Sequence, residues 1–393
     1  MNRLVRWPIS RFYENKGLLY VTTANVVAAG LSATLWLIFA GILSPSQYGQ
    51  ANYYIAVGAL GSVLGTFGFN TLNITRIAKK IEIGNDGMYF FIFIIGIIVS
   101  CIVSIATQSG LTGLLSFSMV AFNMSTSIPL GNGQYDKYMK MVITARSLLI
   151  ILALFFYLLI GLDGILLGYG ASSLIFGYTY FKKLLRTKPT LNGVTKSSIK
   201  FSFHSFVMNF AQSSNIFIDK ILIAPLFGFQ LLGLYQISTQ FLMILAIIPS
   251  SLFLYLLPKE ASGRSNIRLS LYALIFSVFF SFLLFFTSDF ILQNLFPRYI
   301  DAGELVKIIA FGGVPMTIIA GSNSRLLGME KSILVFIGAI IFLLALFSSL
   351  LLLKSVFGNS GVAIALVGSL SAQAAFLVVA EKVQHPKDIF RAI

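Results

Sequence analysis

Long apolar segments dominate the chain and constrain its fold more than any other feature. Twelve of them take up most of the 393 residues, and each is near the length of about 20 residues that a membrane-spanning helix needs. They are expected near 17–43, 51–75, 88–107, 111–130, 141–161, 163–182, 201–227, 231–257, 268–287, 303–324, 332–353 and 360–381. Barrel strands are shorter and alternate in polarity. The sequence therefore predicts an all-α polytopic membrane protein with about 12 transmembrane helices.

Basic residues follow these segments in an alternating pattern. Counting the N-terminal tail as the first gap, odd-numbered gaps are rich in Lys and Arg, and even-numbered gaps hold almost none. The exceptions among the 28 basic residues are Arg298, Lys307, Lys354 and Lys220. Because Lys and Arg beside membrane helices are retained in the cytoplasm, the pattern predicts a multi-pass protein of the cell membrane with both termini cytoplasmic.

Composition excludes several other classes of protein. The chain is 57% hydrophobic and only 10% charged, which no soluble domain of this length can present to water. The net charge of +15 is spread over seven predicted cytoplasmic segments, so it does not indicate nucleic-acid binding; attraction to anionic membrane lipids or to an anionic substrate remains open. The single cysteine, Cys101, permits no internal disulfide or metal cluster. We expect no cofactor and no bound metal.

The chain divides into two halves of six predicted helices. A polar link over 186–200 separates an N-terminal bundle, 1–185, from a C-terminal bundle, 201–393. A shift of 184 residues pairs Lys16 with Lys200, Asn25 with Asn209, Ala40 with Ala224 and Gly49 with Gly233. Since six is even, both halves enter the membrane from the same side. We therefore expect parallel repeats around a central cavity, an arrangement that transporters use.

The seventh segment is unusually polar. At 100° per residue, its side chains Ser205, Asn209, Gln212, Asn215 and Asp219 fall within about 120° of the helix surface, with His204 and Lys220 at the margins. A polar stripe on a spanning helix must face protein or water. In one interpretation the stripe lines a substrate path and Asp219 binds a coupling H+ or Na+. In the other, Asp219 pairs with a neighbouring helix, and Lys220 extends towards the outer headgroups.

Other polar residues lie inside the predicted helices. Asn25 occupies the repeat position of Asn209, and Asn323 precedes Arg325 in the tenth segment. Further examples are Asn73, Asn123 and Thr126. Each suits either a substrate path or a hydrogen bond between helices.

Motifs for catalysis are missing from the sequence. There is no phosphate-binding glycine loop, no zinc-spaced pair of histidines and no Ser-His-Asp set, and the predicted outer loops are short. We expect a protein that is not an enzyme.

Several short motifs occur in a characteristic order. They are Phe39-Ala-Gly-Ile-Leu-Ser-Pro-Ser-Gln-Tyr-Gly49, Asp219-Lys-Ile-Leu-Ile, Leu232-Gly-Leu-Tyr235, Leu295-Phe-Pro-Arg-Tyr-Ile-Asp-Ala302 and Leu326-Leu-Gly-Met-Glu-Lys331. In this order the chain resembles the polysaccharide biosynthesis, or O-antigen-type, flippases of the multidrug/oligosaccharidyl-lipid/polysaccharide (MOP) exporter superfamily. One departure is Pro297-Arg298, which replaces the glycine usual before the loop tyrosine.

The resemblance implies a MATE-like fold and movement of a lipid-linked oligosaccharide, on a polyprenyl phosphate or diphosphate, to the outer leaflet. We expect a monomer. Arg76, Arg146 and Arg325 lie near the inner mouth, where the planar guanidinium suits a phosphate; the cytoplasmic bias of basic residues alone also accounts for them. The alternatives are a cation-coupled antiporter of small molecules, a membrane glycosyltransferase or polymerase, and a scaffold. An antiporter favours carboxylates deep in the first half, which has none.

Overall fold

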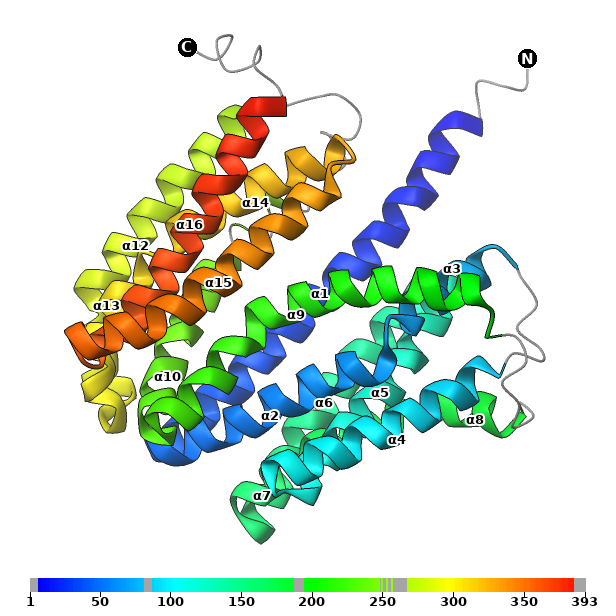
Figure 1. The fold of residues 1–393 in the computed structure, drawn as a ribbon, viewed down its shortest axis with the longest axis horizontal. Coiled ribbons are helices and arrows are strands. Elements are labelled where there is room, and N and C mark those ends of the chain that lie inside the picture. The colour runs from blue at the N-terminus through cyan, green and yellow to red at the C-terminus, as the bar shows by residue number, and fades with distance from the viewer. Residues whose placement is uncertain are drawn as a thin grey trace. The chain divides into compact units, whose positions relative to one another are not determined.

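The chain is helical throughout the part that can be described (Figure 1). A computed structural model describes residues 6–80, 87–186, 194–247 and 267–384, with 249, 252, 253 and 256. The first half contains α1 (Arg6–Ile42), α2 (Pro45–Thr66), α3 (Phe69–Ala78), α4 (Met88–Thr107), α5 (Gly110–Gly131), α6 (Tyr135–Ile160), α7 (Leu162–Phe176) and α8 (Tyr178–Arg186). The second half contains α9 (Lys196–Phe227), α10 (Phe229–Leu245), α12 (Ile267–Leu295), the 3-10 helix η1 (Pro297–Ala302), α13 (Gly303–Ala310), α14 (Gly313–Gly328), α15 (Ser332–Phe357) and α16 (Ser360–Gln384).

Helix lengths agree with the predicted membrane segments. Among the described residues, eight helices are long and apolar enough to cross a membrane, with η1, α13 and α14 counted as one span. A ninth span arises if the bent pair α2 and α3 is counted once, and α7 and α10 are shorter apolar helices. The polar α9, with 32 residues, completes the twelve segments; the end of segment 231–257 lies largely outside the described residues. The predicted all-helical, polytopic membrane fold is confirmed.

The second predicted segment is broken. The axes of α2 and α3 differ by 51°, and the break falls at Phe67 and Gly68, whose φ angles are +45° and +73°. Glycine tolerates a positive φ without a Cβ clash. A Cβ on Gly68 would also lie 2.1 Å from the Ser202 carbonyl oxygen. The break therefore lets α9 pass close to the backbone at this point.

The chain forms two compact units, and the boundary between them does not follow the two halves of the sequence. Unit 1 contains residues 1–39 and 54–213, and unit 2 contains residues 40–53 and 214–393. The turn between α1 and α2 therefore belongs to unit 2. The helix α9 begins in unit 1 and ends in unit 2.

Within unit 2, two glycines mark the internal repeat. A Cβ built on Gly49 would lie 2.0 Å from the Phe229 carbonyl oxygen, and one on Gly233 would lie 1.8 Å from the Pro45 carbonyl oxygen. The shift of 184 residues that relates Gly49 to Gly233 also relates Pro45 to Phe229. Two-fold related copies make such reciprocal contacts. The contact therefore supports a parallel repeat in the register expected from the sequence.

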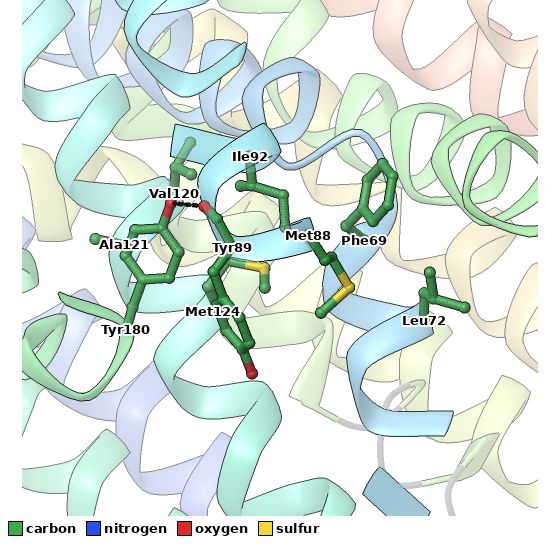
Figure 2. Close-up of a cluster of buried hydrophobic side chains, with 9 residues drawn as sticks. All are labelled: Phe69, Leu72, Met88, Tyr89, Ile92, Val120, Ala121, Met124 and Tyr180. Carbon is green, nitrogen blue, oxygen red and sulfur yellow. Dashed lines mark hydrogen bonds between the residues drawn. The ribbon is translucent and has the colours of Figure 1, made fainter. Parts of the chain in front are cut away.

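In unit 1, one apolar cluster joins four helices and holds α3 in place. Its members are Phe69, Leu72, Met88, Tyr89, Ile92, Val120, Ala121, Met124 and Tyr180. Figure 2 shows the Tyr180 hydroxyl pointing at the backbone of Tyr89, to whose carbonyl oxygen it donates at 3.0 Å. The Tyr89 hydroxyl donates to Asn73, whose amide donates to Ser127. Asn73 thus serves as a hydrogen-bonded contact between helices.

Candidate functional site

Unit 1 contains a polar cavity between α1, α5 and α6. Its volume is about 320 Å³. The polar side chains on its wall are Asn25, Ser32, Asn123, Thr126, Tyr138 and Arg146; the remaining wall is Ala28, Ala29, Phe122 and Val142. No carboxylate is among these described residues. The described wall of the cavity therefore suits an anionic or hydroxyl-rich group better than a cation.

Helical periodicity explains why these residues share one wall. On α1, the lining positions 25, 28, 29 and 32 follow the i, i+3, i+4, i+7 spacing of one helix face. On α6, positions 138, 142 and 146 are successive i, i+4 neighbours. Ser32 and Tyr138 were not among the site residues predicted from the sequence. Their helical spacing from Asn25 and Arg146 is the signal that places them on the same wall.

Arg146 is the charged side chain among the described residues of the cavity wall. It is half-buried, and it forms no hydrogen bond or ion pair with any residue that the structure describes. Across the cavity the Tyr138 hydroxyl lies 3.4 Å from Asn25 Oδ1. A guanidinium presents five N–H donors and no acceptor. Arg146 therefore retains its donors for an oxyanion.

The two other predicted phosphate ligands have protein partners. Arg76 donates to the hydroxyl of Ser198 within unit 1. In unit 2, Arg325 forms a two-bond pair with Glu381, from Nε to Oε1 at 2.5 Å and from Nη2 to Oε2 at 2.9 Å. The Ser322 hydroxyl also donates to Glu381, at 3.0 Å. The charge of Arg325 is thus neutralised locally, which distinguishes it from Arg146.

The polar stripe of α9 has three different environments. Asn209 is half-buried, with Nδ2 3.5 Å from the Thr71 hydroxyl, at the limit of a hydrogen bond. Gln212 is exposed. Asn215 is half-buried, and its Oδ1 is buried without a hydrogen-bond partner in the described structure. Asn323 on α14 likewise has a buried, unpartnered Oδ1 among the described residues. Such groups usually receive a partner from water or from a ligand.

Asp219 and Lys220 are buried together in unit 2, with 6% and 5% of their surfaces exposed. Lys220 Nζ lies 3.1 Å from Asp219 Oδ1 and donates to the Ile216 carbonyl oxygen at 2.6 Å. The Tyr235 hydroxyl of α10 donates to Asp219 Oδ2 at 2.7 Å. This network ties α9 to α10, and Lys220 does not extend to the surface. Tyr235 was noted in a motif, but its bond to Asp219 needs the folded chain.

The fold is similar to that of known membrane transporters, although the sequence matches no known family. No protein-family model matches the chain, and no curated protein matches it in sequence. Solved structures do match over almost all of it. The structure titled "Lipid II flippase MurJ, inward closed conformation" superposes with a TM-score of 0.72 at 15% identity, covering 93% of this chain and 87% of that one.

Two further similar structures are described as transporters of the MOP superfamily. An inward-facing "multidrug resistance MATE family transporter" has a TM-score of 0.69 at 14% identity, over 94% of this chain and 98% of that one. A transporter from Pyrococcus furiosus, whose title reports a "reverse polarity of binding pocket", has a TM-score of 0.58 at 15% identity, over 94% and 95%. The chain has the MOP superfamily fold. It is a multi-pass membrane protein.

Proposed function

We propose that this protein flips a lipid-linked oligosaccharide from the cytoplasmic to the outer leaflet by alternating access, for assembly of a cell-surface glycan. The substrate carries a polyprenyl phosphate or diphosphate. The observation that carries the proposal is the cavity of unit 1, in which Arg146 is the only charged side chain of the described wall.

The chemistry of the cavity suits the phosphate of such a lipid. Moving phosphate charge across about 30 Å of hydrocarbon is costly unless polar groups replace water. Arg146 provides a cation with a planar donor fork, which fits phosphate oxygens. Asn25, Asn123 and Tyr138 provide donors and acceptors for sugar hydroxyls. The apolar chain can remain in the bilayer while the headgroup crosses.

The remaining parts of the proposal concern topology and path. Both termini are cytoplasmic, the membrane is the cell membrane, and the protein acts as a monomer made of bundles 1–185 and 201–393. The stripe on α9 lines the path of the headgroup, together with Asn323. The protein catalyses no covalent step.

A deletion strain tests the function. We expect loss of the surface glycan, with the lipid-linked precursor made in normal amounts but retained in the cytoplasmic leaflet. Wild-type protein should restore export, and Arg146→Ala should not, although it reaches the membrane. If the precursor is not synthesised in the deletion strain, the protein is an enzyme, and the flippase proposal is wrong.

Cation-coupled antiport of a small molecule is the second candidate, because the MATE structures above share the fold and Asp219 is a buried carboxylate. Vesicles containing the purified protein separate the two functions. An antiporter moves a small organic cation when an H+ or Na+ gradient is imposed. The flippase leaves that cation in place and translocates a labelled polyprenyl diphosphate glycan.

A further inference from the structure

The connection between α12 and α13 differs from its counterpart in the first half. Helices α4 and α5 are joined by Gln108 and Ser109 alone, whereas α12 and α13 are separated by Phe296 and the six residues of η1. Both connections join the third and fourth spans of a repeat. The second half therefore carries an additional element, and it includes the unusual Pro297-Arg298 pair.

The element η1 binds the end of α1. Arg298 donates to the carbonyl oxygen of Ile42, the last residue of α1. The Tyr299 hydroxyl donates to the Leu43 carbonyl oxygen at 3.2 Å. The Tyr299 ring also meets the Tyr48 ring edge-on, with 5.7 Å between ring centres. All of these residues belong to unit 2.

The bond from Arg298 satisfies a specific physical need. The last four carbonyl groups of a helix have no partner within the helix, and the negative end of the helix dipole favours a cation. Arg298 supplies both a donor and a positive charge there. Because Arg298 is exposed, its bond exchanges readily with water and is weak enough to break and re-form.

The same turn is held from a second side by α10. Gly49 and Gly233 bring the two backbones into direct contact, as described above. This contact depends on shape, whereas the contact with η1 depends on two directed hydrogen bonds. Residues 40–53, which belong to the first half of the sequence, are therefore bound within unit 2 by two independent elements.

We propose that η1 is a latch on the turn between α1 and α2. Arg298 and Tyr299 hold the turn against η1, and the turn moves away from η1 and exposes Leu43 when both hydrogen bonds break. The role of the latch rests on the proposed transport function. Its opening does not, because accessibility of the turn can be measured without any substrate.

Cysteine labelling tests the latch. In a Cys101→Ala background, Leu43→Cys places a thiol where the native side chain is fully buried. Ser46→Cys, at an exposed residue beside the turn, shows from which side of the membrane the reagent reaches it. A membrane-impermeant maleimide on that face should label Leu43→Cys slowly. Adding Arg298→Ala and Tyr299→Phe should speed labelling roughly tenfold, since losing two hydrogen bonds shifts the equilibrium by about 1.4 kcal/mol.

Lys307→Ala is the matched control. It removes the exposed Lys307–Asp289 ion pair between α13 and α12, 2.5 Å long, which involves no residue of the turn. Labelling in this control should stay at the starting rate. The single variants Arg298→Lys and Tyr299→Phe should give intermediate rates, which guards against misfolding of the double variant.

The latch is wrong if the double variant labels no faster than the starting protein, or if Lys307→Ala speeds labelling equally. Faster labelling in a protein that moves no lipid-linked glycan would keep the latch and reject the proposed substrate.

Discussion

The Tyr235 hydroxyl donates to Asp219 Oδ2 at 2.7 Å. This hydrogen bond connects α10 to Asp219, the only carboxylate in α9. Lys220 approaches the other oxygen of the same carboxylate at 3.1 Å. A buried carboxylate that already has a cation and a hydroxyl partner is positioned to hold two helices together. This arrangement matches one part of the structural interpretation, in which Asp219 pairs with a neighbouring helix. It differs from the other part, because Lys220 turns to the same carboxylate and does not extend towards the headgroups.

Asp219→Asn should destabilise the protein, by about 3–5 kcal/mol, because it leaves the ammonium of Lys220 buried without its counterion. Asp219→Asn with Lys220→Met removes both charges and should recover most of the loss. Tyr235→Phe should cost about 1–2 kcal/mol. Thermal unfolding of the detergent-solubilised variants gives the order. If Asp219 couples an ion, the double variant folds normally yet loses its response to an H+ or Na+ gradient in vesicles.

Gly49→Ala should lower the free energy of unfolding by about 1–3 kcal/mol, because the new methyl group would overlap the Phe229 carbonyl and push the two turns apart. Gly41→Ala is the matched control, since a Cβ there meets nothing within 4 Å. Removing this glycine from α1 should be neutral or stabilising by up to about 1 kcal/mol. Equal melting temperatures for the two variants would contradict the close approach.

Arg146→Ala should lower flipping of a phosphate-bearing lipid roughly tenfold or more, since a hydrogen bond to a charged group is lost. Arg146→Lys should retain part of the activity, because it keeps the charge without the planar fork. The protein should stay folded in both variants. Arg325→Ala should instead reduce stability, because it leaves Glu381 half-buried without its cation. Flipping rates and melting temperatures measured together separate these effects.

Topology is tested by labelling single cysteines in a Cys101→Ala background. Ser46 and Ser109 should react from outside, and Ser197 should react from inside. Ser360 and Asn359 lie between two predicted segments on the outer side, but Ser360 is only 7% exposed. The exposed Asn359 is therefore the better probe and should react from outside. Ser265 lies outside the described residues and remains a predicted inner position. Reversed accessibility at any two sites would contradict the orientation.

Local sequence patterns predicted the helices well, because a spanning segment must satisfy its own backbone hydrogen bonds whatever surrounds it. The bend between α2 and α3 was not predicted, because it depends on a contact with another helix and not on the local sequence pattern. Segment 51–75 contains Asn70 and Asn73 as well as Gly68, but none of these residues by itself predicts a bend of 51°. In the structure the bend falls where the backbone of α9 comes close to Gly68.

The sequence by itself determined that the chain is a helical membrane protein with an internal repeat. Hydropathy and repeat spacing depend only on the order of residues along the chain. It also identified Asn25 and Asp219 as polar residues inside apolar helices, and it placed Arg146 near the inner mouth. Only the tertiary structure decided their surroundings. Arg146 lines a cavity, Arg325 is neutralised by Glu381, and Asp219 is bound by Lys220 and Tyr235. The free energy of a charge inside a protein depends on the groups within a few ångströms, and distant parts of the chain supply those groups.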